Sequence, residues 1–350
     1  MNLTCESTIQ DKKEFAIGEP TQLAEGVYII RQPLPFSPKH INCYLIEDVA
    51  GVTLVDTGMN SKENQDIWDN VLCGELCRNG VKQIYMTHGH PDHIGLGKWL
   101  MEKTGAPMLI TEAERDIVNN SWRGASDHKE EVLQFFMQWG LPEDLINGIY
   151  GMQDGFRNMC PELDFEVTFL QDKQKLSIGH REFQVLYGYG HTPCHATLYC
   201  AEDGLVFTGD QVLPRIFPNI SVWWGTPANP LGNYLESTQW LKQYDYSLAM
   251  PSHDWTFTNV HGRIDEICTF HQQRMQATLE HCQETPRTAF ECIEVVLGKK
   301  TPYFQLGLTL GQAMAVMEAL EAEGKLLRSG EEVFYFQATA AANPSQAVNQ

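Results

Sequence analysis

Residues 87–93 bring three imidazoles and one carboxylate together in one short stretch of the chain. These side chains are His88, His90, Asp92 and His93. Imidazole nitrogens and carboxylate oxygens are ligands that divalent transition metals prefer. The stretch follows an apolar, β-prone run at residues 81–86, and Gly89 and Pro91 disfavour helical geometry. The sequence therefore predicts a metal site in a loop at the end of a strand.

The spacing His88-x-His90-x-Asp92-His93 resembles the signature of the metallo-β-lactamase-fold hydrolases. Four other segments resemble further blocks of that family, and all five occur in the family's order over roughly residues 25–261. The four are Asp56-Thr57-Gly58, Gly190-His191-Thr192-Pro193-Cys194-His195, Phe207-Thr208-Gly209-Asp210 and Pro251-Ser252-His253-Asp254. Two departures occur: Cys194 stands where many relatives have Gly, and Ser252-His253-Asp254 replaces a more usual Gly-His-Gly. Neither removes a ligand that the resemblance implies.

The resemblance implies two divalent metal ions and seven protein ligands. His88, His90 and His191 would hold one ion, Asp92, His93 and His253 the other, and Asp210 would bridge them. Zinc is the default metal, although His and Asp ligands without Cys also accept iron or manganese. Paired ions lower the pKa of a shared water, so that hydroxide forms near neutral pH and attacks a carbonyl or phosphoryl centre. Asp92 is also a candidate proton acceptor, while Asp56 and His195 would support the ligands from behind.

The pattern of strands and helices predicts an α/β fold, the αββα sandwich that the resemblance implies. Alternating apolar residues between 26 and 55 predict an antiparallel meander. Helical patterns at 61–77 and 95–103 alternate with apolar strands, which is typical of a sheet covered by helices. A second sheet is predicted from strands at residues 167–170, 181–187, 196–200 and 205–208.

The chain is expected to have four parts. These are an N-terminal arm at 1–21, a catalytic domain at 22–262, a small C-terminal α+β domain at 263–337 and a disordered tail at 338–350. A helical insertion at 112–161 is either a lid over the site or an extra packing layer. Helices followed by a hairpin predict a winged-helix-like C-terminal domain, similar to that of the β-lactamase-like proteins that include a mitochondrial endoribonuclease.

Charge and composition narrow the partners of the protein. The 350 residues carry a formal net charge of -20, and the C-terminal segment 284–332 is acidic as well. Because nucleic-acid binding depends on Lys and Arg at phosphates, a nucleic-acid partner is disfavoured, and the C-terminal domain suits packing or homodimer formation better. No run is apolar enough for an export signal or a membrane span, and the ten cysteines show no repeated spacing and no Cys-x-x-Cys pair. We expect a cytoplasmic protein without a membrane partner.

Three functions fit these residues. The first is hydrolysis of a thioester of the acyl-CoA, acyl-carrier or acyl-glutathione type, since a thiolate leaving group needs little protonation. Similarity to glyoxalase-II-like relatives supports it, although the glutathione-specific C-terminal part of glyoxalase II is not evident. The second is a phosphodiesterase or endoribonuclease, which the C-terminal domain favours and the charge opposes; lactonase and β-lactamase activities rank lower. The third, a non-catalytic metal-sequestering protein, is disfavoured because all seven ligand positions are present.

A long irregular segment, residues 211–233, follows Asp210 directly. Irregular segments of this length are often functional. Trp223 and Trp224 in this segment are candidates for an apolar wall against a small-molecule acyl substrate. The alternative, given equal weight, is that both rings fill the core beneath the loop.

Overall fold

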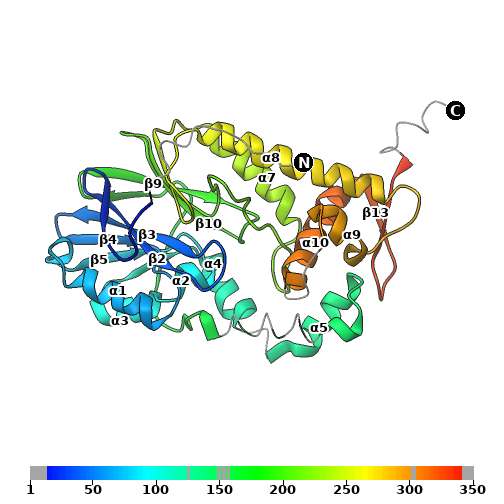
Figure 1. Cartoon of the computed structure of the whole chain (residues 1–350), viewed down its shortest axis with the longest axis horizontal. Coiled ribbons are helices and arrows are strands. Elements are labelled where there is room, and N and C mark those ends of the chain that lie inside the picture. Colours follow the sequence, from blue (N-terminus) through cyan, green and yellow to red (C-terminus); the bar gives the residue numbers. More distant parts are fainter. Residues whose placement is uncertain are drawn as a thin grey trace.

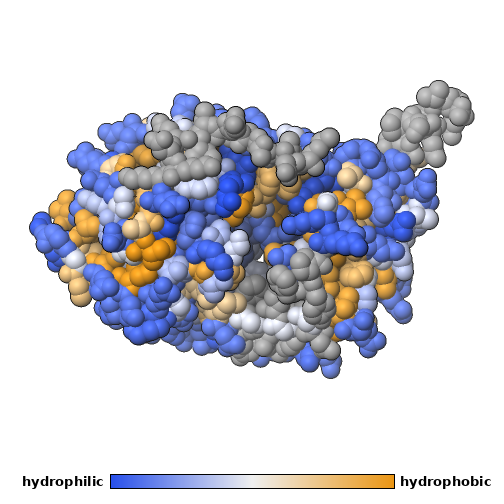
Figure 2. Space-filling model, viewed as in Figure 1, coloured by the Kyte–Doolittle hydropathy of each residue, from blue (hydrophilic) through white to orange (hydrophobic). Residues whose placement is uncertain are grey.

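The computed structural model describes residues 14–123, 127–146, 148, 151, 155, 158–300 and 305–340. Two β-sheets lie face to face with helices on their outer sides, so the predicted αββα arrangement is confirmed (Figure 1). Helices α1 (Lys62–Leu72) and α3 (Gly97–Thr104) lie beside the first sheet, and α7 (Pro230–Leu241) and α8 (Val260–His281) lie on the side of the second. Figure 2 shows that hydrophilic residues cover much of this face, which is hollowed near its centre.

The first sheet has seven strands in the order of the sequence. They are β1 (Thr21–Ala24), β2 (Val27–Pro33), β3 (His40–Asp48), β4 (Gly51–Val55), β5 (Val81–Tyr85), β6 (Met108–Ile110) and β7 (Thr168–Phe169). The first four pair antiparallel, as the meander predicted, and the remainder pair parallel. The assignment of residues 167–170 to the second sheet is wrong. After the insertion the chain returns to the open edge beside β6, where Thr168 pairs with Leu109.

The second sheet has five strands in the order β12-β11-β10-β9-β8. They are β8 (Lys175–Ile178), β9 (Arg181–Gly188), β10 (His195–Cys200), β11 (Leu205–Gly209) and β12 (Leu248–Pro251). Sequence analysis missed β8 because its four residues include Lys and Ser and form no apolar run. Buried side chains of both sheets form one core, in which the rings of Tyr44 and Phe207 meet edge to face at 5.1 Å.

A short helix, α2 (Pro91–Ile94), replaces the non-helical loop predicted for the metal-binding stretch. Pro91 occupies its first turn, where a missing N–H leaves no hydrogen bond unmade and the fixed φ suits the helix. Asp92 and His93 therefore sit on one helical turn directly after His90. The helix predicted at 61–77 is also divided: α1 ends at Leu72, and a separate 3-10 turn (Glu75–Cys77) follows.

The C-terminal end of α5, a helix of the insertion, packs against the C-terminal part of the chain. The insertion contributes α4 (Glu112–Ile117), a π-helical turn (Val118–Trp122), α5 (Lys129–Gln138) and a 3-10 turn (Glu143–Leu145). The C-terminal part contributes α9 (Ala289–Leu297), α10 (Leu306–Ala322) and the hairpin β13 (Leu326–Ser329) and β14 (Tyr335–Ala338). The ring of Trp139 stacks on Phe336 at 5.5 Å, and the carbonyl of Gln138 accepts the N–H of Phe334 at 2.6 Å. The lid role and the winged-helix assignment stay predictions.

The described part of the N-terminal arm lies against the first sheet. Phe15 is buried, and the N–H of Gly18 donates to the carbonyl of Arg31 at 2.8 Å. Residues 1–13 of the predicted arm and 341–350 of the predicted tail lie outside the described residues. In the described parts of the chain, no helix has both the length and the apolar character that a membrane span needs.

We predict that Trp139→Ala destabilises the protein by about 3–5 kcal/mol, because it removes a buried ring that joins α5 to the C-terminal hairpin. Urea unfolding followed by fluorescence would measure the change. Met137→Ala is the matched control: its side chain on the same helix is 40% exposed, so a change of less than about 0.5 kcal/mol is expected. Equal midpoints for the two variants would contradict the packing role.

Candidate active site

Strand ends from both sheets bring the predicted metal ligands together. His88 and His90 follow β5, His191 follows β9, Asp210 follows β11 and His253 follows β12. With Asp92 and His93 of α2, they form three overlapping groups whose ligand atoms lie within 4.8 Å of one another. The groups are His88, His90 and His191; His88, His93 and Asp210; and Asp92, His93 and His253. All seven side chains that the sequence nominated are therefore gathered at one place.

Asp210 lies between the two triads that were assigned to separate ions. Its Oδ2 atom is 3.6 Å from Nε2 of His191 and 3.4 Å from Nε2 of His253. Its Oδ1 atom is 3.6 Å from Nε2 of His93. One carboxylate therefore reaches donor atoms of both triads, which is the position that a bridging ligand needs.

Three of the histidines turn Nε2 toward the cluster and contact the protein through Nδ1. The contacts are His93 Nδ1 with Asp56 Oδ2 at 2.8 Å, His191 Nδ1 with the Asn219 carbonyl at 2.9 Å, and His253 Nδ1 with the His40 carbonyl at 2.9 Å. A neutral imidazole that donates from Nδ1 presents a lone pair at Nε2, the form that binds metal. Nε2 of His93 and Oδ1 of Asp210 are buried without a hydrogen-bond partner among the described residues. These donors fit a divalent metal centre.

The charges around the cluster favour a bound cation. Burial, reinforced by neighbouring imidazoles, lowers the pKa of His88 far below its ordinary value and that of His90 to about 3, so both rings are neutral. Burial acts the same way on His93, but neighbouring carboxylates, Asp92 foremost, outweigh it and raise the pKa of His93 to about 10. A ring that retains its proton so strongly marks an excess of negative charge. A divalent cation would neutralise this charge in place of the proton, which leaves Nε2 of His93 as a metal-binding lone pair.

Asp56 and His195 contact the segments that carry the predicted ligands. The Asp56 carboxylate accepts the N–H of Thr87 at 2.8 Å and the Thr87 hydroxyl, in addition to its contact with His93. Nε2 of His195 accepts the N–H of Asp210 at 3.2 Å. Neither side chain belongs to the three groups of potential ligands.

Glu114, which the sequence analysis missed, joins two of the ligand-bearing loops. Its buried carboxylate accepts the N–H of Gly89 through Oε2 at 2.7 Å and the N–H of Cys194 through Oε1 at 2.8 Å. Gly89 separates His88 from His90, and Cys194 follows His191 by three residues. Burial raises the pKa of Glu114, although both hydrogen bonds act against that rise. In the sequence Glu114 is an ordinary acidic residue in the first turn of a helix, so no sequence signal indicated its contacts with the two loops.

His40 supports the loop that carries His253 and was also missed. In addition to its carbonyl contact with His253, its Nε2 atom accepts the N–H of Asp254 at 3.0 Å. Burial and the charge of Arg31 lower the pKa of His40 to about 4, which keeps the ring neutral and able to accept.

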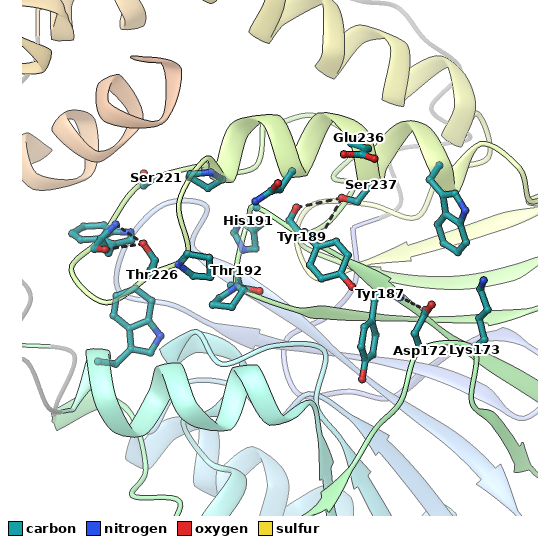
Figure 3. A pocket seen from close by; sticks show the side chains of 18 residues that line it. Asp172, Lys173, Tyr187, Tyr189, His191, Thr192, Ser221, Thr226, Glu236 and Ser237 are labelled. Carbon is teal, nitrogen blue, oxygen red and sulfur yellow. Dashed lines mark hydrogen bonds between the residues drawn. The ribbon is translucent and has the colours of Figure 1, made fainter. Parts of the chain in front are cut away.

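A groove of about 560 Å³ runs along α7 and is lined by His191 and Thr192 near its middle (Figure 3). Trp223, a predicted wall residue, belongs to its lining, together with Trp122 of the insertion. Trp224 is absent from that lining, and its ring lies against His128 at 5.2 Å. The groove therefore connects the cluster of predicted metal ligands with an aromatic surface to which Trp223 and Trp122 of the insertion contribute.

A family model of the metallo-beta-lactamase superfamily matches residues 37–253, and the chain belongs to that superfamily. The predicted family and the predicted enzyme class, a hydrolase, are thereby confirmed. A beta-lactamase domain protein from Burkholderia ambifaria is 30% identical, with a TM-score of 0.83 over 93% of this chain and 96% of its own. A metallo-beta-lactamase family protein from Thermus thermophilus is 27% identical, with a TM-score of 0.77 over 91% of this chain and 100% of its own.

A more distant relative carries a substrate in its name. The atrochrysone carboxyl ACP thioesterase of Emericella nidulans is 22% identical over 227 residues, which are 65% of this chain. The match covers 55% of that relative, so this chain spans about half of its length.

We predict that Glu114→Gln weakens metal binding by about 10–100-fold, because an amide NH₂ would face one of the two backbone N–H donors and loosen both loops. Competition with a chromophoric chelator would measure the affinity. Glu112→Gln, on the exposed side of the same helix, is the control and should bind metal like the unaltered protein. Wild-type affinity in Glu114→Gln would show that the two loops hold their positions without this carboxylate.

Proposed function

We propose that the protein is a dinuclear metal-dependent hydrolase that cleaves thioesters. The observation that carries the proposal is the aromatic groove that passes His191, because it offers an apolar acyl group a place directly beside the cluster of donor side chains. The thioesterase named among the relatives supports the same substrate class. Because the identity to this relative is low, the relative supports thioesters as the substrate class but does not indicate a particular acyl group.

The donor groups fit the two ions that the sequence suggested. His88, His90 and His191 would hold the first ion, Asp92, His93 and His253 the second, and Asp210 would bridge them. Zinc suits this nitrogen-rich set best, and iron or manganese would also fit. When bound, such a pair acidifies water and polarises the carbonyl oxygen of a substrate.

In the proposed reaction, a side chain of the protein accepts the proton that the attacking water loses. The oxygen of water forms a bond to the acyl carbon while the C–S bond breaks, which gives a carboxylic acid, a thiolate and one proton that passes to Asp92 and then to solvent. The carboxylate of Asp92 lies 3.4 Å from Nε2 of His253, inside the cluster of donor side chains, and is placed to take the proton from the attacking water. The thiolate leaves without protonation, so the described cluster requires no separate strong acid.

The groove carries too little positive charge to favour a phosphodiester or RNA substrate over a thioester. Among the described residues that line it, Lys173 is the one cation, and it is accompanied by Asp172 and Glu236. Binding of a phosphate backbone needs several cations at the phosphates. The groove lacks that feature, whereas its aromatic side chains suit an uncharged group.

We predict that His90→Ala loses bound metal and lowers turnover more than about 100-fold, since it removes a ring whose Nδ1 atom lies 3.0 Å from Nε2 of His88. The measurement is metal content by mass spectrometry together with hydrolysis of a panel. The panel holds acyl-CoA and acyl-glutathione thioesters, a lactone, a β-lactam, a phosphodiester and short RNA.

The control for this prediction is His128→Ala, which removes an exposed histidine outside the donor groups. It should keep both metal and turnover. Full turnover by metal-depleted His90→Ala protein would contradict the metal-dependent mechanism. Cleavage of RNA with no reaction of the thioesters would instead contradict the substrate class and leave the metal site intact.

A further inference from the structure

The groove has two unlike ends on either side of His191 (Figure 3). Ser221 and Thr226 lie on one side, and Tyr187 and Lys173 lie on the other. A substrate bound over His191 would therefore send one of its arms into each end. The chemistry of the two ends indicates which arm belongs where.

The end beside Ser221 and Thr226, here called the Trp end, is formed by the rings of Trp122 and Trp223. These rings meet edge to face at 6.0 Å, and only 3% and 5% of the two residues is exposed. The ring of Trp122 also lies 5.8 Å from that of His90, so the apolar wall reaches the donor cluster. The parts of these two rings that border the groove are apolar, and they favour apolar groups of a ligand, which pack against them.

The other end, here called the open end, combines aromatic rings with hydroxyl and charged groups and carries a net negative charge. Tyr189 is 42% exposed there, and Nζ of Lys173 lies 5.7 Å from the ring centroid of Trp240. Asp172 and Glu236 outnumber this single cation, which leaves one net negative charge among the described lining residues. An anionic group would be repelled in this end, whereas hydroxyl and amide groups find hydrogen-bond partners.

We propose that the groove selects thioesters with a ring-bearing, uncharged acyl group in the Trp end and an uncharged, amide-bearing thiol arm of the pantetheine class in the open end. This assignment rests on the proposed thioester hydrolysis for the identity of the ligand. The volume of about 560 Å³ suits a ligand of drug-like size and exceeds what an acetyl group fills. The carboxylates of glutathione and the phosphates of coenzyme A are disfavoured by the charge of the open end.

Binding of uncleavable thioethers to the metal-loaded full chain tests the assignment. The probes are the 2-naphthylmethyl thioethers of pantetheine, coenzyme A and glutathione, and the S-ethyl thioether of pantetheine, each titrated by calorimetry. We expect naphthylmethyl-pantetheine to bind at least about tenfold more tightly than the other three probes. Trp223→Ala should remove most of the preference for naphthylmethyl over ethyl.

A charge reversal tests the open end separately. Glu236→Lys changes its net charge from negative to positive and should improve the affinity for the coenzyme A probe about three- to fivefold relative to the pantetheine probe, an effect that added salt reduces. Glu202→Lys, in the exposed turn between β10 and β11, makes the same charge change away from the groove and should leave the ratio as in the wild type.

Two results would overturn the assignment: equal affinity for the naphthylmethyl and ethyl probes, or a coenzyme A to pantetheine ratio that Glu236→Lys leaves unchanged. Because the probes are not cleaved, their affinities are independent of turnover. A protein that shows the expected order of affinities but hydrolyses no thioester would overturn the proposed function and leave the binding assignment standing.

Discussion

Asp210 directly follows β11, an internal strand of the second sheet, and its carboxylate lies within 3.6 Å of the ring nitrogens of His93, His191 and His253. A cluster of buried carboxylates and imidazoles of this density is unfavourable unless each charge is compensated. A divalent cation would supply that compensation, and the surrounding structure keeps the donors in place for it. Each donor segment starts at a strand end, so the register of the two sheets fixes the positions from which the side chains converge.

The C-terminal part of the chain supports the same cluster through the irregular segment after Asp210. The carbonyl of Asn219 accepts from Nδ1 of His191, and its side-chain oxygen accepts from Nε2 of Gln312 on α10 at 2.9 Å. The N–H of Val222, beside the groove, donates to the carbonyl of Gly311 at 3.0 Å. Helix α10 thus contacts the segment that orients His191 and the segment beside Trp223 of the groove, so this part of the chain packs against the candidate site.

The sequence predicted the sandwich and the seven side chains now found together through its resemblance to a family, because the motifs that carry the resemblance are short and lie at strand ends. Sequence analysis missed Glu114 and His40 because they contact the ligand-bearing loops through backbone groups, and they come from segments that are distant from those loops in sequence. The two-residue strand β7 was misplaced because its sheet depends on where the chain returns after the insertion. Trp223 and Trp224 are adjacent and alike in sequence, so only three-dimensional packing distinguishes the ring that lines the groove.

Anomalous diffraction from crystals of the metal-loaded protein, recorded at the zinc, iron and manganese edges, tests the central claim most directly. The account predicts two peaks per chain. One should lie among His88, His90 and His191, and the other among Asp92, His93 and His253, with Asp210 in contact with both. A single peak, or a metal bound outside the three donor groups, would contradict the dinuclear centre on which the proposed chemistry depends.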